Sequence, residues 1–392
     1  MPVAIWVIGF GIFAQGTSEL MLAGLLPGLA GDLGVSIPEA GLLITAFALG
    51  MLIGAPMLGV LTLRWPRKYA LLVFLAVFIL SHVIGALTDS YTLLFAMRFA
   101  GAFAYAGFWA VGGSTAMVLA GSERRGRAMS IVAGGLTVAT VLGLPAGTWI
   151  GQHFEWRGAF WAVAALSTLA AVAIAFTVPA LRPETAPRAF DEIRGLMRPR
   201  LWLSYGMTAV ATAALLGTFS YLAAMLIETT GIDDGWVPVV LFGYGLGAVL
   251  GIATGGRTAD RFPHAVLGVG FTGLLVASVA LAVTAYHSGP VVALVAVLGF
   301  VGFSTNPALN SRVVAIAPKA PTLVVSGNVS AFNVGISVGP WLGGLALSAG
   351  YGYPAITWIG AALAALALLL WLVDLTLTSR RHRSACPLAV PS

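Results

Sequence analysis

A single carboxylate, Glu19, stands inside the first long apolar run of the sequence, within the stretch Phe13–Met21. The run covers residues 3 to about 30, and about 20 apolar residues at ~1.5 Å each cross a ~30 Å hydrocarbon core. We therefore expect Glu19 to lie within a membrane. A carboxylate there is costly, faces protein or water rather than lipid, and by default marks an ion or substrate path. The alternative is a packing role in which the carboxyl group is protonated or permanently hydrogen-bonded to Thr17, Ser18 or another helix.

A second charge, Arg98, lies about six residues inside the fourth apolar run, or ~9 Å from its outer end, whereas Glu19 lies ~15 Å in. The long arginine side chain can close that gap. A guanidinium beside Glu19 favours the ionised carboxylate, and its withdrawal when substrate arrives favours protonation. The two residues could therefore exchange a proton for a substrate. Alternatively, Arg98 extends outward to the lipid headgroups.

A cavity for an amphipathic substrate needs aromatic walls and a few polar groups. Candidates occur in the first, fourth, seventh and tenth apolar runs, and they are Gln15, Ser18, Tyr105, Phe108, Phe219, Tyr221, Asn306 and Asn310. Each aromatic side chain could equally face lipid or the protein core, and Asn328 and Asn333 could bond to a neighbouring helix. We interpret His82 as a neutral, hydrogen-bonded core residue, since a single histidine on an apolar helix is seldom a titrating site.

The composition identifies the class of protein. Of 392 residues, 59% are hydrophobic and only 9% are charged, which indicates a polytopic membrane protein rather than a soluble domain. The net charge of +6 comes from basic residues in short loops, and no nucleic-acid-binding motif accompanies them. With one cysteine, Cys386, we expect no disulfide framework, metal site or cofactor. No phosphate-binding loop, paired intramembrane aspartates or Ser/His pair indicates an enzyme.

The apolar runs give the organisation of the chain. About 12 runs are long enough to cross a bilayer, and they lie near 4–29, 40–62, 69–88, 92–119, 128–150, 158–180, 201–226, 237–256, 264–286, 289–316, 323–349 and 353–377. We expect an all-α membrane protein with an N-terminal six-helix bundle (1–181), a cytoplasmic linker (182–200), a C-terminal six-helix bundle (201–378) and a cytoplasmic tail (379–392). The linker is compatible with a surface helix or a disordered tether.

Positive charges predict the orientation of the helices. Arginine and lysine occur on alternate connections and in the tail, and only Arg98 and Arg157 depart from this rule. Because basic loops stay on the cytoplasmic side, both termini are expected to be cytoplasmic.

The two halves resemble each other when shifted by about 196 residues, which is typical of a transporter built from two bundles. An internal repeat of this kind favours alternating access over a static pore. The motif that contains Gly143, Pro145 and Gly147 corresponds to the motif that contains Gly339, Pro340 and Gly343. These residues either let the helices bend where the two bundles meet or only allow helices to pack closely. The two short basic loops that follow the second and eighth apolar runs also correspond. Each could act as a charge latch, in which charge-assisted bonds to neighbouring helices hold one conformation, or as a tight turn whose basic residues only set the membrane topology. Their key residues are Gly59, Arg64, Asp260 and Arg261.

On these motifs the whole chain resembles the major facilitator superfamily, specifically the twelve-helix drug:proton antiporters. The loop Gly59–Lys68 is similar to the family signature but has Leu63 where Asp is usual and Pro66 where Gly is usual. The second loop keeps Asp260, so the resemblance implies that any latch is weaker in the first half. Arg98 matches the arginine of the span-4 motif, which implies a role in proton coupling.

Three stretches, Phe13–Leu25, Ala40–Ala48 and Ile53–Met57, are very similar to chloramphenicol-resistance exporters of high-GC Gram-positive bacteria. The resemblance implies proton-driven export of chloramphenicol across the bacterial plasma membrane, with Glu19 carrying the proton, Arg98 tuning it, and aromatic and amide groups holding the neutral drug. We expect the partners to be the drug, protons and the bilayer, with no nucleic acid, and the chain to function as a monomer. Export of a sugar, nucleoside or other drug, import, and a non-transporting receptor are the alternatives.

Overall fold

The computed structural model describes residues 1–62, 65–121, 125–180, 198–259, 261–317 and 321–384. All regular elements in these ranges are helices, and twelve stretches are long and apolar enough to cross a membrane. The predicted fold class, an all-α membrane protein, is therefore confirmed. The helices of the first half are α1 (Val3–Leu33), α2 (Ile37–Leu61), α3 (Arg67–Leu87), α4 (Tyr91–Ala120), α5 (Arg125–Val138), α6 (Leu144–His153) and α7 (Glu155–Thr177).

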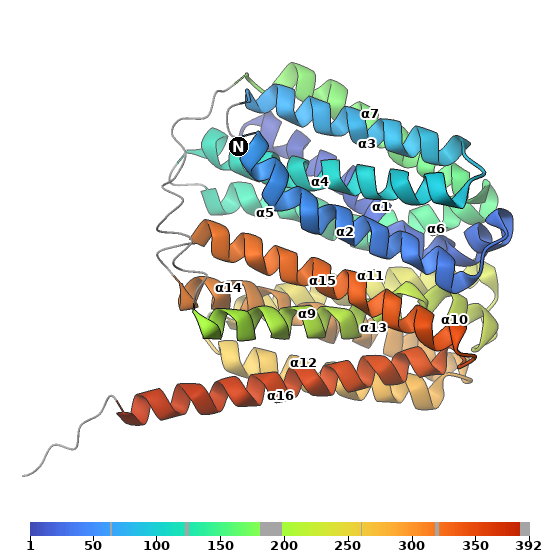
Figure 1. The fold of residues 1–392 in the computed structure, drawn as a ribbon, viewed down its shortest axis with the longest axis vertical. Coiled ribbons are helices and arrows are strands. Elements are labelled where there is room, and N and C mark those ends of the chain that lie inside the picture. Colours follow the sequence, from blue (N-terminus) through green and yellow to red (C-terminus); the bar gives the residue numbers. More distant parts are fainter. Residues whose placement is uncertain (63–64, 122–124, 181–197, 260, 318–320, 385–392) are drawn as a thin grey trace, which may run out of the picture.

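The helices of the second half lie together in the lower part of Figure 1, below those of the first half. They are α9 (Pro199–Ser220), α10 (Leu222–Glu228), α11 (Val237–Ala259), α12 (Pro263–Thr284), α13 (Ser288–Ser304), α14 (Asn306–Ile316), α15 (Pro321–Ser348) and α16 (Pro354–Ser384). Most of the segment predicted as a linker lies outside the described residues, so the domain boundaries stay a prediction.

One membrane crossing in the first half is made of two helices. There α5 and α6 are joined by a π-helical turn, Ala139–Gly143, and Pro145 stands in the first turn of α6. Proline cannot donate a backbone hydrogen bond, and a single π turn accommodates such an interruption. The corresponding crossing of the second half, α15, continues through Pro340 as one helix. The two repeated motifs therefore have different local backbones.

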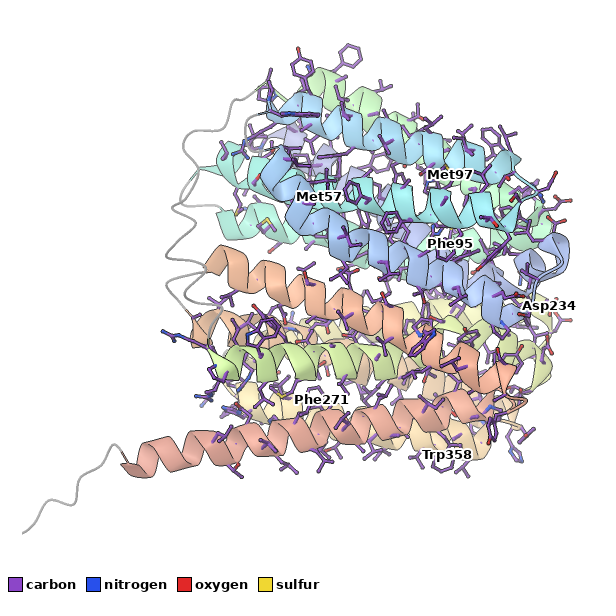
Figure 2. All side chains as sticks on the ribbon, in the orientation of Figure 1. Met57, Phe95, Met97, Asp234, Phe271 and Trp358 are labelled. Atoms are coloured by element: carbon purple, nitrogen blue, oxygen red, sulfur yellow. The ribbon has the colours of Figure 1, made fainter. Side chains whose placement is uncertain are left out.

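The start of α1 and the end of α16 lie at the same end of the helix bundle, on the left of Figure 1. We call it the termini end, and we call the opposite end, where Asp234 lies in Figure 2, the distal end. Arg67 and Arg125 begin α3 and α5 at the termini end, as the alternation of basic loops requires. The cytoplasmic location of this end stays a prediction.

Large apolar side chains cover the outside of the bundle. Met57 and Trp358, both labelled in Figure 2, are about half exposed, at 50% and 51%. Phe176 and Val269 are exposed to 87% and 74%. Such a surface would promote association in water, whereas in a bilayer it faces lipid tails.

The two halves contact each other at the distal end, chiefly through α2 and α15. The Thr45 hydroxyl of α2 donates to the Ser337 carbonyl of α15 at 3.2 Å. Nearby, Gln152 of the first half donates through its amide to the Asp234 carbonyl of the second half at 2.7 Å. These bonds describe a conformation in which the halves are joined at the distal end.

Gly41 of α2 allows this approach, because an added Cβ would overlap the hydroxyl group of Tyr221 in the second half. Overpacking costs ~1–3 kcal/mol, so Gly41→Val is expected to lower the ratio of this conformation to the others about 5- to 150-fold. The export that the family resemblance implies should slow accordingly when it is measured as efflux from cells. Gly28→Val on α1, where an added Cβ meets no atom within 4 Å, is the matched control. Equal efflux rates at equal expression would show that the contact does not matter for the transport cycle.

Candidate substrate and proton site

Two polar side chains on α1 donate hydrogen bonds to carbonyl groups one turn earlier in the same helix, as is usual for polar groups inside a membrane. The Thr17 hydroxyl donates to the Phe13 carbonyl at 2.8 Å, and the Gln15 amide donates to the Gly11 carbonyl at 3.1 Å. Glu19 differs from them: it keeps part of its surface accessible, and no hydrogen bond or ion pair between described residues involves its carboxylate. Its role in proton coupling stays a prediction.

The Arg98 side chain turns into the bundle rather than toward the headgroups. It is 2% exposed, and its Nη1 donates to the Ser18 hydroxyl at 2.7 Å and to the Ser18 carbonyl at 3.2 Å. The guanidinium lies over the ring of Phe47 on α2, 4.4 Å from its centre. Among the described residues, Arg98 is thus held at the residue next to Glu19, without an ion pair within 4.0 Å.

His82 of α3 completes this polar cluster. Its Nε2 lies 2.6 Å from the Ser18 hydroxyl, and its Nδ1 lies 2.8 Å from the Phe78 carbonyl. A carbonyl only accepts, so we assign the proton to Nδ1, which leaves Nε2 to accept from Ser18. The ring is 3% exposed and packs on Phe78 and Phe160. This agrees with the interpretation of His82 as a neutral core residue and adds a partner that the sequence did not indicate.

The predicted aromatic residues of α4 pack against this cluster and α1. Tyr105 and Phe108 are fully buried, and the indole of Trp109 donates to the Tyr105 hydroxyl at 3.0 Å. An added Cβ at Gly11 would meet the Phe108 ring at 2.6 Å. Ser18, Tyr105 and Phe108 are therefore brought to one region, and they are enclosed in this conformation.

The candidates from the second half occupy two separate places. Phe219 stacks on Tyr244 with ring centres 4.5 Å apart. Tyr221 donates to the Pro340 carbonyl at 3.0 Å and reaches the contact between the halves. Near the termini end, Asn310 accepts from Asn328 at 2.9 Å.

Among the asparagines of α14 and α15, Asn310 and Asn328 bond to each other between the two helices. Asn328 also accepts from the Thr208 hydroxyl of α9 at 2.8 Å, so it joins three helices. This is the bond to a neighbouring helix that the sequence analysis gave as the alternative to a place in the cavity. Asn310 donates to the Asn306 carbonyl of its own helix at 3.0 Å, and both side chains keep some exposure. Asn333 likewise bonds within its helix, to the Val329 carbonyl.

The conformational motifs are described in part. Arg64 and Asp260 lie outside the described residues, and Arg261 is exposed beside the Phe262 ring. The latch therefore stays a prediction. Gly339 lies against the Ala213 carbonyl of α9, and Gly143 lies against Thr17 of α1, so these glycines are close helix contacts. Gly59 lies in the last turns of α2.

Sequence reasoning missed a buried charge cluster in the second half. Asp374 of α16 is 0% exposed, forms an ion pair with Arg312 of α14 and lies 3.4 Å from Arg200 of α9. Beside it, a cavity of about 830 Å³ is lined by Arg198, Arg200 and His264, among other residues. Asp374 falls inside the last apolar run, so the reasoning applied to Glu19 could have found it.

Arg157 is an exception to the charge rule, and the structure gives a reason. It forms ion pairs with Asp32 and with Asp89, and the Trp156 indole donates to the same Asp32 carboxylate at 2.9 Å. Two carboxylates thus balance this arginine at the distal end, tying α7 to α1 and to the α3–α4 connection.

Several known proteins are similar to the chain. A chloramphenicol resistance protein of Streptomyces lividans is 39% identical, covering 94% of this chain and 95% of that protein. The uncharacterized transporter YtbD of Bacillus subtilis is 34% identical over 91% of both chains, and the inner membrane transport protein YdhP of Escherichia coli K12 is 32% identical over 93% of both. A bacterial homologue of the human lysosomal transporter Spinster, solved in an inward-facing and unoccupied conformation, shares the fold with a TM-score of 0.73, at 18% identity and over 96% and 94% of the two chains.

Twelve crossing helices that enclose buried charged groups define a membrane transporter. The chain belongs to the Major Facilitator Superfamily, whose family model matches residues 8–320 and again 201–387. It is a multi-pass protein of a bacterial cell membrane. Members of this family act on small-molecule substrates within a membrane and are not in general enzymes.

Proposed function

We propose that the chain exports chloramphenicol in exchange for protons. The observation that carries this proposal is the 39% identity, over nearly the full length of both chains, to a chloramphenicol resistance protein. The cluster around Glu19 supports the proton part, because a partly accessible carboxylate next to an arginine-binding serine can change protonation as the arginine moves.

Chloramphenicol is neutral, so its binding needs no charged partner. Aromatic walls and amide or hydroxyl groups suit it, and Tyr105, Phe219 and Tyr221 are the aromatic groups we propose. Their burial implies that the drug enters only after the halves rearrange. With the termini on the cytoplasmic side, the contact through Thr45 and Ser337 lies at the extracellular end, so this conformation is closed toward the outside of the cell.

Accumulation of radiolabelled chloramphenicol in sensitive cells tests the proposal. Cells that express the chain should hold less drug than empty cells, and an uncoupler that collapses the proton gradient should restore the level. Equal accumulation in expressing and empty cells under both conditions would contradict chloramphenicol export.

A second candidate is proton-coupled export of another small molecule, such as a sugar, a nucleoside or a different drug. The similarity to YtbD and YdhP, whose names give no substrate, favours keeping it. A resistance panel combined with efflux of labelled metabolites separates the two candidates.

A further inference from the structure

We propose that Ser18 and His82 form a second binding place for the Arg98 guanidinium, which releases Glu19 to take up its proton. This inference rests on the proposed proton coupling and names the groups that control it. Three helices contribute: Ser18 from α1, His82 from α3 and Arg98 from α4.

The hydrogen bonds have a consistent direction. Arg98 Nη1 donates to the Ser18 hydroxyl at 2.7 Å, and that hydroxyl donates its own proton to His82 Nε2 at 2.6 Å. The Nδ1 of His82 donates to the Phe78 carbonyl at 2.8 Å, which fixes the tautomer. Without the ring, the Ser18 hydroxyl would have to find another acceptor, and its lone pairs would no longer be directed at Arg98.

The contact competes with Glu19 for the same guanidinium. Glu19 follows Ser18 in the chain, so rotation of the long Arg98 side chain moves its charge from one residue to the other. Two of its nitrogens, Nε and Nη2, are buried without a hydrogen-bond partner among the described residues, which leaves the guanidinium with donors to offer a carboxylate. When Arg98 sits on Ser18, the Glu19 carboxylate has no direct ion pair with it and takes up a proton; when the proton leaves, Arg98 moves onto the carboxylate.

The groups that can titrate around this switch are few in the described part of the chain. They are Glu19 on α1, His82 on α3, and Arg98 and Tyr105 on α4, while α2 and α7 contribute the apolar rings of Phe47 and Phe160. His82 keeps its neutral tautomer in both positions of Arg98, so it acts as a positioning residue. Glu19 is the group that exchanges the proton.

The test is drug-driven proton movement in liposomes, measured against pH. Ser18→Ala and His82→Phe remove the second binding place, so Arg98 stays on Glu19 and the half-maximal pH is expected to move to the acid side by about one unit. His82→Gln, which retains an amide acceptor, should restore most of the original profile. Ser167→Ala, which changes a buried serine of α7 without a hydrogen-bond partner among the described residues, is the matched control and should leave the profile unchanged.

A second measurement does not depend on the drug. Infrared titration of the purified protein follows the carboxyl band that Glu19→Gln removes, and its midpoint should shift to lower pH in Ser18→Ala. An unshifted midpoint, or unshifted proton movement in both variants, overturns the inference. If the wild type moves no protons with chloramphenicol while the infrared midpoint still shifts, the drug assignment fails and the Arg98 switch stands.

Discussion

Replacement of Glu19 by glutamine is expected to abolish uphill export while leaving the protein folded in the membrane. Glutamine resembles the protonated acid in shape but cannot release a proton, so the cycle loses its coupling. In liposomes with a pH gradient, the wild type should concentrate the drug. If one proton is exchanged for each drug molecule, the ratio of drug concentrations across the membrane should reach about tenfold for each pH unit, whereas Glu19→Gln should build no concentration difference.

Two controls accompany this prediction. Exchange of labelled for unlabelled drug without a pH gradient needs no proton, so Glu19→Gln should retain it if the binding site is intact. Glu228→Gln makes the same chemical change at an exposed position of α10 and should export normally. Uphill export by Glu19→Gln at matched protein amounts would refute the proton role of this residue.

The largest loss of stability is expected from Asp374→Ala. Its carboxylate is fully buried and faces Arg312, whose side chain is only 9% exposed. Removing one partner of a buried ion pair leaves an uncompensated charge, which typically costs ~3–5 kcal/mol of unfolding free energy. We expect a lower melting temperature in detergent and a lower yield of folded protein.

The double variant Asp374→Leu with Arg312→Leu removes both members of the buried ion pair and leaves Arg200, whose side chain is 27% exposed. It should recover much of the lost stability, because a well-packed apolar pair replaces a buried ion pair at little cost. Asp89→Ala is the exposed comparison: its side chain is 92% accessible and pairs with Arg157 at 2.6 Å, so little measurable change is expected. A melting temperature of Asp374→Ala equal to that of the wild type would show that this ion pair does not support the fold.

The sequence by itself determined the class of protein and the number of membrane crossings. Hydropathy reports the free energy of moving each segment into lipid, which is a local quantity, so the twelve crossings follow from composition along the chain. The cost of a charge in lipid is also local, and it singles out Glu19 and Arg98 from their positions within apolar runs. The same rule applies to Asp374, which stands in the last apolar run but was not singled out from the sequence.

Only the tertiary structure decided which of these groups meet. Ser18 and His82 are 64 positions apart, and their contact depends on how α1 and α3 are rotated about their axes. Both helices carry apolar residues around most of their circumference, so the sequence does not indicate which face turns toward the interior. That rotation is set by close packing against neighbouring helices. Helix packing likewise brings Asp374 to Arg312. It also brings Gly41 to Tyr221, where the lack of a glycine side chain allows the two halves of the chain to approach. The charges of this transporter were readable from the sequence, whereas their partners were set by the packing of its helices.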